Sequence, residues 1–361
     1  MTRHLLMGLL CAAIAGACGG ARSGSADGDD QGPEGNGSPD AGPRLNPPGT
    51  HSHSLTVGAL TREVIVYVPA LAEETRAPAV FMFHGTSGTG QLFYDISGWK
   101  EKADTEGMIV LFPSALTHCY HEDENDDGDF TDPGERKVLT KWAAGKLGEP
   151  DGMPLCTADE VAALSAGQQA LADHPLADDM AFFDAMLGLL AGSYVVDDRA
   201  IHVTGFSNGA QMSSRLAVER SDRVAAGHAS GGTLSVDGVA SRPLSMIFSV
   251  GALDDRFTTL AGVEELPLTE AELNALPVFR GIVGAYLAAL QLSEAYSYEL
   301  ITIGGGKQAA RFLFSTSLVG AGNTFEAVVL EDLPHQYPNG ANYPLSAPNQ
   351  VWAFFETQRL P

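Results

Sequence analysis

A serine in a Gly-rich turn is the first residue of this chain whose setting could support covalent chemistry. Ser207 lies in the stretch Gly205-Phe206-Ser207-Asn208-Gly209, which fits the pattern G-x-S-x-G. Residues typical of a strand precede it, and residues 210–219 are typical of a helix. Such a strand-to-helix turn exposes the serine hydroxyl and points the positive end of the helix at its oxygen. Ser207 is therefore predicted to be a nucleophile.

A serine nucleophile needs a base and an acid that orients the base, and both residue types follow Ser207 in the chain. The stretch FSVGALDDRF ends an apolar strand pattern with Asp254 and Asp255. Further on, EDLPHQYPNG places His335 in a turn-rich loop after the last strong strand pattern. The order serine, acid, histidine predicts a triad of Ser207, one of the two aspartates, and His335.

A loop before the serine could complete the site. The stretch FMFHGTSGTG, residues 81–90, ends a buried-strand pattern with His84-Gly85-Thr86. Such a loop can bring a backbone N–H to the serine from the opposite side, so the amides of Thr86 and Asn208 are predicted to form the oxyanion hole. We interpret His84 as a packed, hydrogen-bonded loop residue and not as a second base.

The candidate residues must be positioned by strands and helices that alternate along the chain. Apolar runs typical of buried strands cover residues 79–83, 108–112, 200–204, 244–250, 311–315 and 325–330, and helical patterns include 178–192 and 210–219. This alternation predicts an α/β fold with a mostly parallel central sheet and helices on both faces. Two further segments, about 118–175 and 262–298, are expected as insertions over the carboxyl ends of the strands, where α/β folds bind ligands.

Four stretches together resemble a known family. HGTSG, GFSNGAQMS, VGALDD and HQYPNG are similar, in this order, to motifs of the secreted esterases that include polyhydroxybutyrate depolymerases, feruloyl esterases and acetylxylan esterases. The similarity spans roughly residues 53–358. It implies an α/β-hydrolase fold and ester hydrolysis through an acyl-serine intermediate, with no cofactor for catalysis.

The resemblance also implies roles for single residues. Ser207 matches the nucleophile, Asp254 the acid and His335 the base, and Gly251 three residues before the aspartate favours Asp254 over Asp255. The chain departs from the family in the residues around the acid, in the extra Asn before Gly in HQYPNG, and in the length of segment 118–175. Because that segment shapes the substrate site in the family, the substrate does not carry over.

Two other functions share some of these features. A serine peptidase of the prolyl oligopeptidase kind has the same elbow and residue order, but residues before the elbow include no propeller-sized segment. A catalytically silent surface-binding module braced by calcium is the alternative from a different class, and the intact order of serine, acid and histidine disfavours it. Trp99 and Trp142 are candidates either for an aromatic pocket wall or for the core.

The beginning of the chain is typical of an exported protein. Arg3 and His4 precede a short apolar run, residues 5–17, which is typical of the signal peptide predicted over residues 1–18. The run ends in a stretch that resembles a bacterial lipoprotein box, so Cys18 is a predicted lipid attachment site, with an ordinary signal peptide as the alternative. Residues 19–50 are rich in Gly, Pro, Ser and Asp and are predicted to be a disordered tether to a catalytic domain over 51–361. We expect a secreted or cell-envelope protein.

Cysteine usage and charge agree with export and narrow the partners. Cys119 and Cys156 remain after the signal peptide, and an oxidising compartment predicts a disulfide between them, with two free thiols as the alternative. The formal net charge of −24 disfavours nucleic acid and anionic membrane surfaces as partners. We expect a polymeric or small ester as substrate, a membrane only through the lipid anchor, and a monomer.

An acidic stretch within segment 118–175 resembles a calcium loop. In DENDDGDFTDPGE, residues 123–135, oxygen-bearing side chains alternate around a Gly turn. The candidate ligands are Asp123, Asn125, Asp127, Asp129 and Asp132. Gly134 stands where a calcium loop usually has its bidentate Glu, so a structural calcium site and a solvated acidic turn both remain open.

Overall fold

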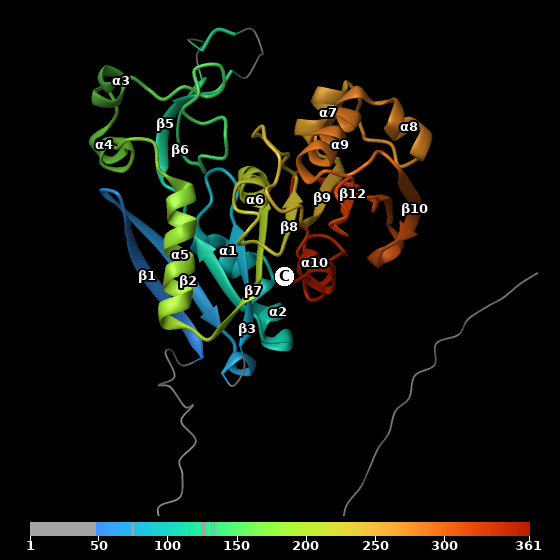
Figure 1. Ribbon diagram of the computed structural model, residues 1–361. Coiled ribbons are helices and arrows are strands. Elements are labelled where there is room, and N and C mark those ends of the chain that lie inside the picture. The colour runs from blue at the N-terminus through green and yellow to red at the C-terminus, as the bar shows by residue number, and fades with distance from the viewer. Residues whose placement is uncertain (1–47, 74–75, 124–127, 131, 133) are drawn as a thin grey trace, which may run out of the picture. The chain divides into compact units, whose positions relative to one another are not determined.

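The computed structural model describes residues 48–73, 76–123, 128–130, 132 and 134–361. Its centre is a 10-stranded sheet with the order β1-β2-β4-β3-β7-β8-β9-β12-β11-β10, and β5 and β6 form a separate pair (Figure 1). The strands are β1 (Gly49–Val57), β2 (Leu60–Val68), β3 (Ala77–Phe83), β4 (Ile109–Pro113), β5 (Thr117–His121), β6 (Arg136–Thr140), β7 (Val196–Phe206), β8 (Ala226–Ser230), β9 (Ser245–Leu253), β10 (Tyr296–Thr302), β11 (Gln308–Phe314) and β12 (Phe325–Pro334).

The middle of the sheet is parallel and its two edges are antiparallel. Strands β4, β3, β7, β8, β9 and β12 run parallel to one another. The hairpin of β1 and β2 closes one edge antiparallel to β4, and β11 and β10 close the other edge beyond β12. This mostly parallel, doubly wound sheet, with a nucleophile elbow after a central strand, is an α/β-hydrolase fold, as the sequence predicted.

Helices cover the sheet on both faces. Those packed in the larger core cluster include α5, α6 and α9, and those in the second cluster are α1, α2 and α10. The helices are α1 (Gly90–Ile96), α2 (Trp99–Glu106), α3 (Ala158–Ala162), α4 (Ala166–Ala172), α5 (Asp179–Ser193), α6 (Asn208–Glu219), α7 (Asp255–Ala261), α8 (Glu270–Ala275), α9 (Pro277–Leu290) and α10 (Ala347–Phe355), with single 3-10 turns at Ala70–Ala72 and Gly304–Gly306.

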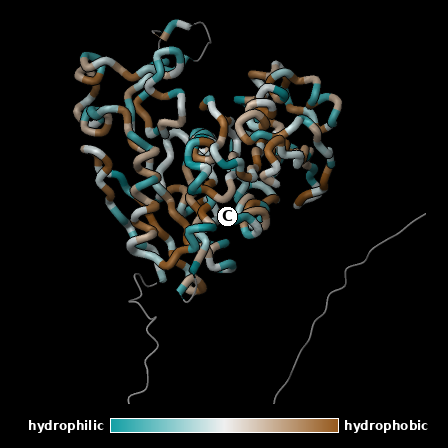
Figure 2. The backbone as a smooth tube through the Cα atoms, viewed as in Figure 1, coloured by the Kyte–Doolittle hydropathy of each residue, from teal (hydrophilic) through white to brown (hydrophobic). Residues whose placement is uncertain are grey.

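Strand β3 shows how one apolar run serves both cores. Phe81 and Phe83 belong to the cluster with α5 and α6, whereas Val80 and Met82 belong to the cluster with α2 and α10. Successive side chains of a strand point to opposite faces, so a strand covered on both sides is apolar throughout. Helix α6 instead has polar residues on its less buried side, Gln211, Arg215 and Glu219 at every fourth position, and Figure 2 shows hydrophilic and hydrophobic segments along the tube.

The second predicted insertion is placed differently from the expectation. Residues 262–298 do not all lie over the carboxyl ends of the strands, because α9 packs against the face of the sheet. The reason is its apolar stripe, in which Phe279, Val283 and Tyr286 are buried; Tyr286 stacks on Phe325 of β12. Helix α9 therefore covers the sheet and not the active-site end of the strands.

The first predicted insertion, residues 118–175, adds a small structural unit that packs against the larger core through Trp142 and Ala144. It contains the β5–β6 pair and two short helices, α3 and α4. Figure 1 shows this unit at the end of the sheet where β9 runs into α7. Within the described ranges, a helix with the length and the hydrophobicity of a membrane span is not found.

Candidate active site

The nucleophile elbow has the strained backbone that the motif predicts. Ser207 lies between β7 and α6 with φ 54° and ψ −120°, a conformation that costs energy for a residue with a side chain. A methyl group at Gly205 would lie 2.1 Å from the carbonyl oxygen of Gly209. One at Gly209 would lie 2.2 Å from the carbonyl oxygen of Phe83. The two glycines are thus required by close backbone approach.

The structure brings Ser207, Asp254 and His335 together. His335 Nε2 lies 3.0 Å from Ser207 Oγ, and His335 Nδ1 lies 2.8 Å from Asp254 Oδ2. Because an ionised carboxylate only accepts, Nδ1 donates to Asp254, which leaves Nε2 free to accept the serine proton. The Asp254 side chain is 2% exposed and that of His335 is 16% exposed, so the acid is shielded while the base can be reached.

The structure also shows which of the two neighbouring aspartates contacts His335. Asp254 is buried at the end of β9, and its Oδ1 accepts the N–H of Arg256 at 3.2 Å while Oδ2 holds the histidine. Asp255 is exposed as the first residue of α7. The acid in contact with His335 is therefore Asp254.

A third close approach aligns the acid with the histidine. A methyl group at Gly251 of β9 would lie 1.9 Å from the carbonyl oxygen of Leu333. Leu333 belongs to β12 and comes two residues before His335. The parallel pairing of β9 and β12 shifts its register between Leu330 and Pro334. The glycine lets the backbone at the end of β12 come close to β9, just before the two residues, Asp254 and His335, whose side chains are hydrogen-bonded.

The predicted oxyanion donors flank the serine. A methyl group at Gly85 would lie 3.2 Å from Ser207 Cβ, so the loop that carries Thr86 touches the nucleophile. Asn208 is the first residue of α6, a position whose backbone N–H has no acceptor within a helix. Their assignment as the oxyanion hole remains a prediction that this placement supports.

The other histidines near the strand ends are structural. His84 Nε2 accepts the N–H of Ala115 at 3.0 Å, so Nδ1 carries the proton and donates to the Gly85 carbonyl at 2.7 Å. Burial lowers the pKa of His84 to about 4. His228 lies between the hydroxyl groups of Thr204 and Ser249, and burial lowers its pKa to about 3. Both are neutral near pH 7 and already bonded, as the interpretation of His84 anticipated.

Comparison with known proteins gives distant similarities. No protein-family model matches the chain. A segment of 66 residues, 18% of this chain, is 33% identical to S-formylglutathione hydrolase of Mus musculus and covers 23% of that protein. The match thus spans about a quarter of the length of this curated relative.

Similar solved structures include esterases. An acetyl xylan esterase from Aspergillus awamori is 14% identical, with 85% of this chain and 99% of that one covered and a TM-score of 0.46. The S-formylglutathione hydrolase of Agrobacterium tumefaciens is 12% identical over 86% and 95%, with a TM-score of 0.47, and a ferulic acid esterase is 13% identical over 85% and 97%, with a TM-score of 0.45. At this level of similarity the assignment of an activity rests on the site itself.

One part of the site could not be recognised in the sequence. Trp142, at the end of β6, is fully buried, and its backbone N–H donates to the side chain of Asn208 at 2.6 Å. Trp99 is fully buried as well, with its Nε1 donating to Tyr337. Both tryptophans therefore belong to the core and not to a pocket wall. The contact between Trp142 of the insertion and Asn208 of the elbow could not be predicted, because the two residues are 66 positions apart.

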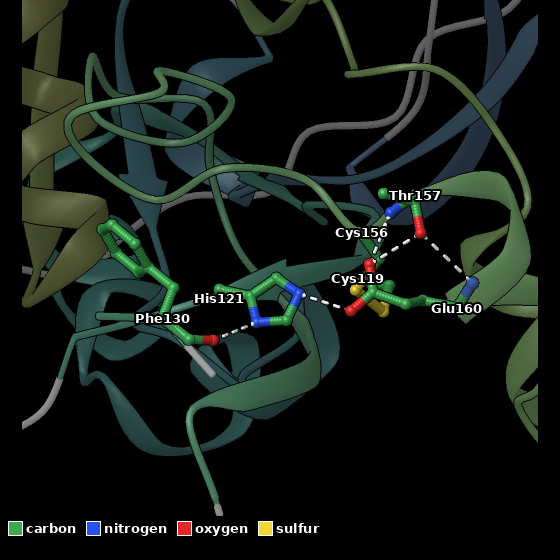
Figure 3. Close-up of a disulfide and its surroundings, with 6 residues drawn as sticks. All are labelled: Cys119, His121, Phe130, Cys156, Thr157 and Glu160. Atoms are coloured by element: carbon green, nitrogen blue, oxygen red, sulfur yellow. Dashed lines mark hydrogen bonds and ion pairs between the residues drawn. A yellow bond between two sulfur atoms is a disulfide. The ribbon is translucent and has the colours of Figure 1, made fainter. Parts of the chain in front are cut away.

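The predicted disulfide is confirmed. Cys119 of β5 and Cys156 are joined across 37 residues, and Figure 3 shows His121 and Glu160 beside the bridge. His121, Cys156 and Glu160 offer atoms within 4.8 Å of one another, a grouping that could hold a metal. The Cys156 sulfur is used by the disulfide, however, and His121 Nε2 pairs with Glu160 at 3.0 Å.

The predicted calcium ligands are only partly described. Asp123 Oδ2 accepts the N–H of Gly128 at 2.8 Å. Asp129 and Asp132 are described as well, but Asn125 and Asp127 lie outside the described residues, as does Cys18 with the whole segment before residue 48. Calcium binding and lipid attachment therefore remain predictions.

Proposed function

We propose that this chain is a serine carboxylic-ester hydrolase that works through an acyl-serine intermediate. The observation that carries the proposal is the bridging position of His335, 3.0 Å from Ser207 Oγ and 2.8 Å from Asp254 Oδ2. A base in contact with both a hydroxyl group and a buried carboxylate is what activation of a serine requires.

The proposed reaction has two halves. His335 accepts the Ser207 proton as Oγ attacks the ester carbonyl carbon, and the amides of Thr86 and Asn208 donate to the oxygen that becomes negative. His335 then gives the proton to the leaving alcohol. In the second half it activates water, which releases the acid and restores the serine. Asp254 stabilises the imidazolium in both halves, and no step involves a cofactor.

Replacement of the nucleophile tests this proposal. The Ser207→Ala variant should lose hydrolysis of p-nitrophenyl acetate while its circular dichroism and melting temperature stay near those of the wild type. The matched control is Ser54→Ala, an exposed serine of β1, which should keep full activity. A fluorophosphonate probe should label Ser207 in the wild type and nothing in Ser207→Ala. Retained turnover in Ser207→Ala would show that another residue does the chemistry.

For the substrate, we propose a polyester or a plant cell-wall ester, on the basis of the resemblance in the motifs. Turnover of polyhydroxybutyrate film, methyl ferulate and acetylated xylan, compared on one preparation, ranks these classes. Cleavage of a peptidyl p-nitroanilide with no ester cleavage would support a peptidase instead. A wild-type protein that neither turns over esters nor reacts with the probe would support the silent binding module.

We propose that the enzyme works outside the cytoplasm as a monomer, attached through Cys18 when lipidated. The mass of the mature amino terminus tests this, because processing before Cys18 with lipid attached adds a diacylglyceryl and an acyl group. A structural calcium ion in the acidic turn is a separate proposal. Calorimetric titration with calcium tests it, and no heat of binding at millimolar calcium would exclude the site.

A further inference from the structure

A short segment at the end of β6, residues Thr140–Ala144, contacts both sides of the nucleophile; we call it the clasp. On the side of the His-Gly loop, the N–H of Ser87 donates to the Thr140 carbonyl at 2.9 Å, and the Thr140 hydroxyl donates to the Gly88 carbonyl at 2.8 Å. The indole of Trp142 donates to the His84 carbonyl at 2.8 Å. The loop that carries Thr86 is thus bonded to the clasp at three points.

On the other side the clasp is bonded to the elbow helix. Asn208 accepts the N–H of Trp142 at 2.6 Å and donates to the Trp142 carbonyl at 3.2 Å, so its side chain pairs with both backbone groups of one residue. Arg215 of α6 donates to the Ala143 carbonyl at 2.5 Å. Asn208 is 4% exposed, so water cannot readily replace these bonds.

The clasp is itself held in place from a third direction. The N–H of Ala143 donates to Asp179 at 2.7 Å, and Asp179 pairs with the buried Arg62 at 2.6 Å. The His-Gly loop and the start of α6 are both bonded to the clasp, so a clasp that does not move keeps the distance between them constant. The clasp is therefore suited to hold the His-Gly loop and the start of α6 at a constant spacing.

That spacing matters because the two predicted oxyanion donors lie on different segments. Strands β3 and β7 are paired up to Phe83 and Gly205, and Thr86 and Asn208 come after this ladder ends. An oxyanion hole works when its donors are already aimed at the developing charge before reaction. Contacts that fix the distance between the two amides therefore act on the transition state and only weakly on substrate binding.

We propose that Asn208 and Thr140 are positioning residues for the oxyanion hole, acting through the clasp. Asn208 then has two roles: its backbone amide is one donor, and its side chain holds the clasp that keeps the other donor in place. This inference rests on the proposed function, because it concerns the rate of ester cleavage. It also assigns the insertion 118–175 a part in catalysis besides any part in substrate choice.

Substitutions that break the clasp without touching the triad test the inference. Thr140→Val keeps the shape of the side chain and removes the hydroxyl bond to Gly88, whereas Thr140→Ser keeps that bond. We expect kcat for p-nitrophenyl acetate to fall about 3- to 10-fold in Thr140→Val at nearly unchanged KM, and to stay near wild type in Thr140→Ser. Asn208→Leu removes both bonds to Trp142 and should lower kcat about 10²-fold.

Each kcat is expressed per active site, with sites counted by fluorophosphonate labelling at completion, so that unfolded protein does not contribute. The rate of that labelling should fall in parallel, since phosphonylation also builds negative charge on an oxygen. The matched control is Gln211→Ala. It removes the Gln211 oxygen that accepts a hydrogen bond from the side-chain Nδ2 of Asn208 at 3.1 Å, leaves the bonds of the clasp in place, and should keep kcat.

The outcomes separate this inference from the proposed function. If the wild type hydrolyses esters but kcat per labelled site is unchanged in both Thr140→Val and Asn208→Leu, the clasp is only structural and the inference is overturned. A rise in KM alone overturns it too. If Asn208→Leu does not fold, the pair Thr140→Val and Thr140→Ser still decides. A wild type without esterase activity overturns both proposals.

Discussion

Two regions of the molecule, the catalytic edge and the insertion 118–175, are each stabilised by a different kind of contact. The catalytic edge is the carboxyl end of the central strands, with Ser207, Asp254 and His335. At the catalytic edge, backbone meets backbone across glycines: Gly205 against the Gly209 carbonyl, and Gly251 against the Leu333 carbonyl. A methyl group at either position would lie within 2.1 Å of a carbonyl oxygen. Placement of the triad therefore depends on short sequence motifs in which glycine cannot be replaced.

The insertion is held by side chains that reach distant parts of the chain. A disulfide joins Cys119 to Cys156, and the ring of His174 contacts the Thr117 and Pro175 carbonyls at 2.9 and 2.8 Å. Helices α3 and α4 begin with capping boxes at Thr157 and Ser165 but have five and seven residues, too short to be stable alone. Its conformation thus depends on cross-links, and single substitutions in the two regions should have different consequences.

The largest effect is expected from the acid of the triad. Asp254→Asn should lower kcat for p-nitrophenyl acetate about 10⁴-fold, because an amide at this place favours the wrong tautomer of His335. The adjacent substitution Asp255→Asn, on an exposed residue, should leave kcat nearly unchanged and serves as the control. Equal losses of kcat in the two variants would contradict the assignment of Asp254 as the acid of the triad. They would also contradict the conclusion that short motifs place the triad residues.

The next effect concerns the insertion. Removing the bridge in the double variant Cys119→Ser, Cys156→Ser should lower the free energy of unfolding by about 3–4 kcal/mol, since a loop of this length is no longer closed in the unfolded chain. Urea unfolding followed by fluorescence measures the change. Wild type treated with a reducing agent should shift by the same amount. An unchanged urea midpoint in both would mean that the insertion does not depend on its cross-link.

The difference between the regions also explains what the sequence could predict. The elbow, the acid and the histidine loop were found because each is a short motif that follows an apolar strand, β7, β9 or β12. The close approach at Gly251 also explains why Asp254 rather than Asp255 reaches His335.

Other elements gave no local pattern. Strand β8 (Ala226–Ser230) was missed because its small residues, with His228 among them, lack the branched and aromatic side chains typical of strands. Strand β10 was missed because it is an exposed edge strand. The bonds between Asn208 and Trp142 join residues 66 positions apart, and a polar residue in an elbow motif does not indicate its partner. The expected place of residues 262–298 was wrong for the same reason, because the sequence identifies an apolar stripe and not what covers it.

A smaller effect compares two glycines. Gly251→Ala should lower kcat about 10²-fold, because the methyl group forces the Leu333 backbone away and moves His335 by a fraction of an ångström or more. Gly281→Ala, in α9 where nothing lies within 4 Å of an added methyl group, should keep kcat and raise the free energy of unfolding by about 0.5–1 kcal/mol. Full activity in Gly251→Ala would show that the catalytic edge tolerates displacement.

A last comparison uses pH on one buried histidine from each region. Burial lowers the pKa of His118, in the insertion, to about 3, helped by the neighbouring His174 and Arg62, and lowers that of His84, at the catalytic edge, to about 4. A histidine whose pKa is lowered on folding contributes fully above the unfolded pKa of about 6.5, and its contribution is lost as the pH falls below that value. Between pH 8 and pH 5 each should cost about 2 kcal/mol of the free energy of unfolding.

Replacing each histidine by phenylalanine separates the pH term from the hydrogen bonds. His118 Nε2 is buried without a hydrogen-bond partner in the described chain, so His118→Phe should cost little at pH 8 and remove about 2 kcal/mol of the loss at pH 5. His84→Phe removes the same pH term, but it leaves the Ala115 N–H and the Gly85 carbonyl without their hydrogen-bond partner. Each unsatisfied group should lower the free energy of unfolding at pH 8 by about 1–3 kcal/mol. Urea unfolding of both variants at the two pH values measures this. Equal losses at pH 8 would mean that the polar bonds of the catalytic edge contribute no more than the packing of the insertion.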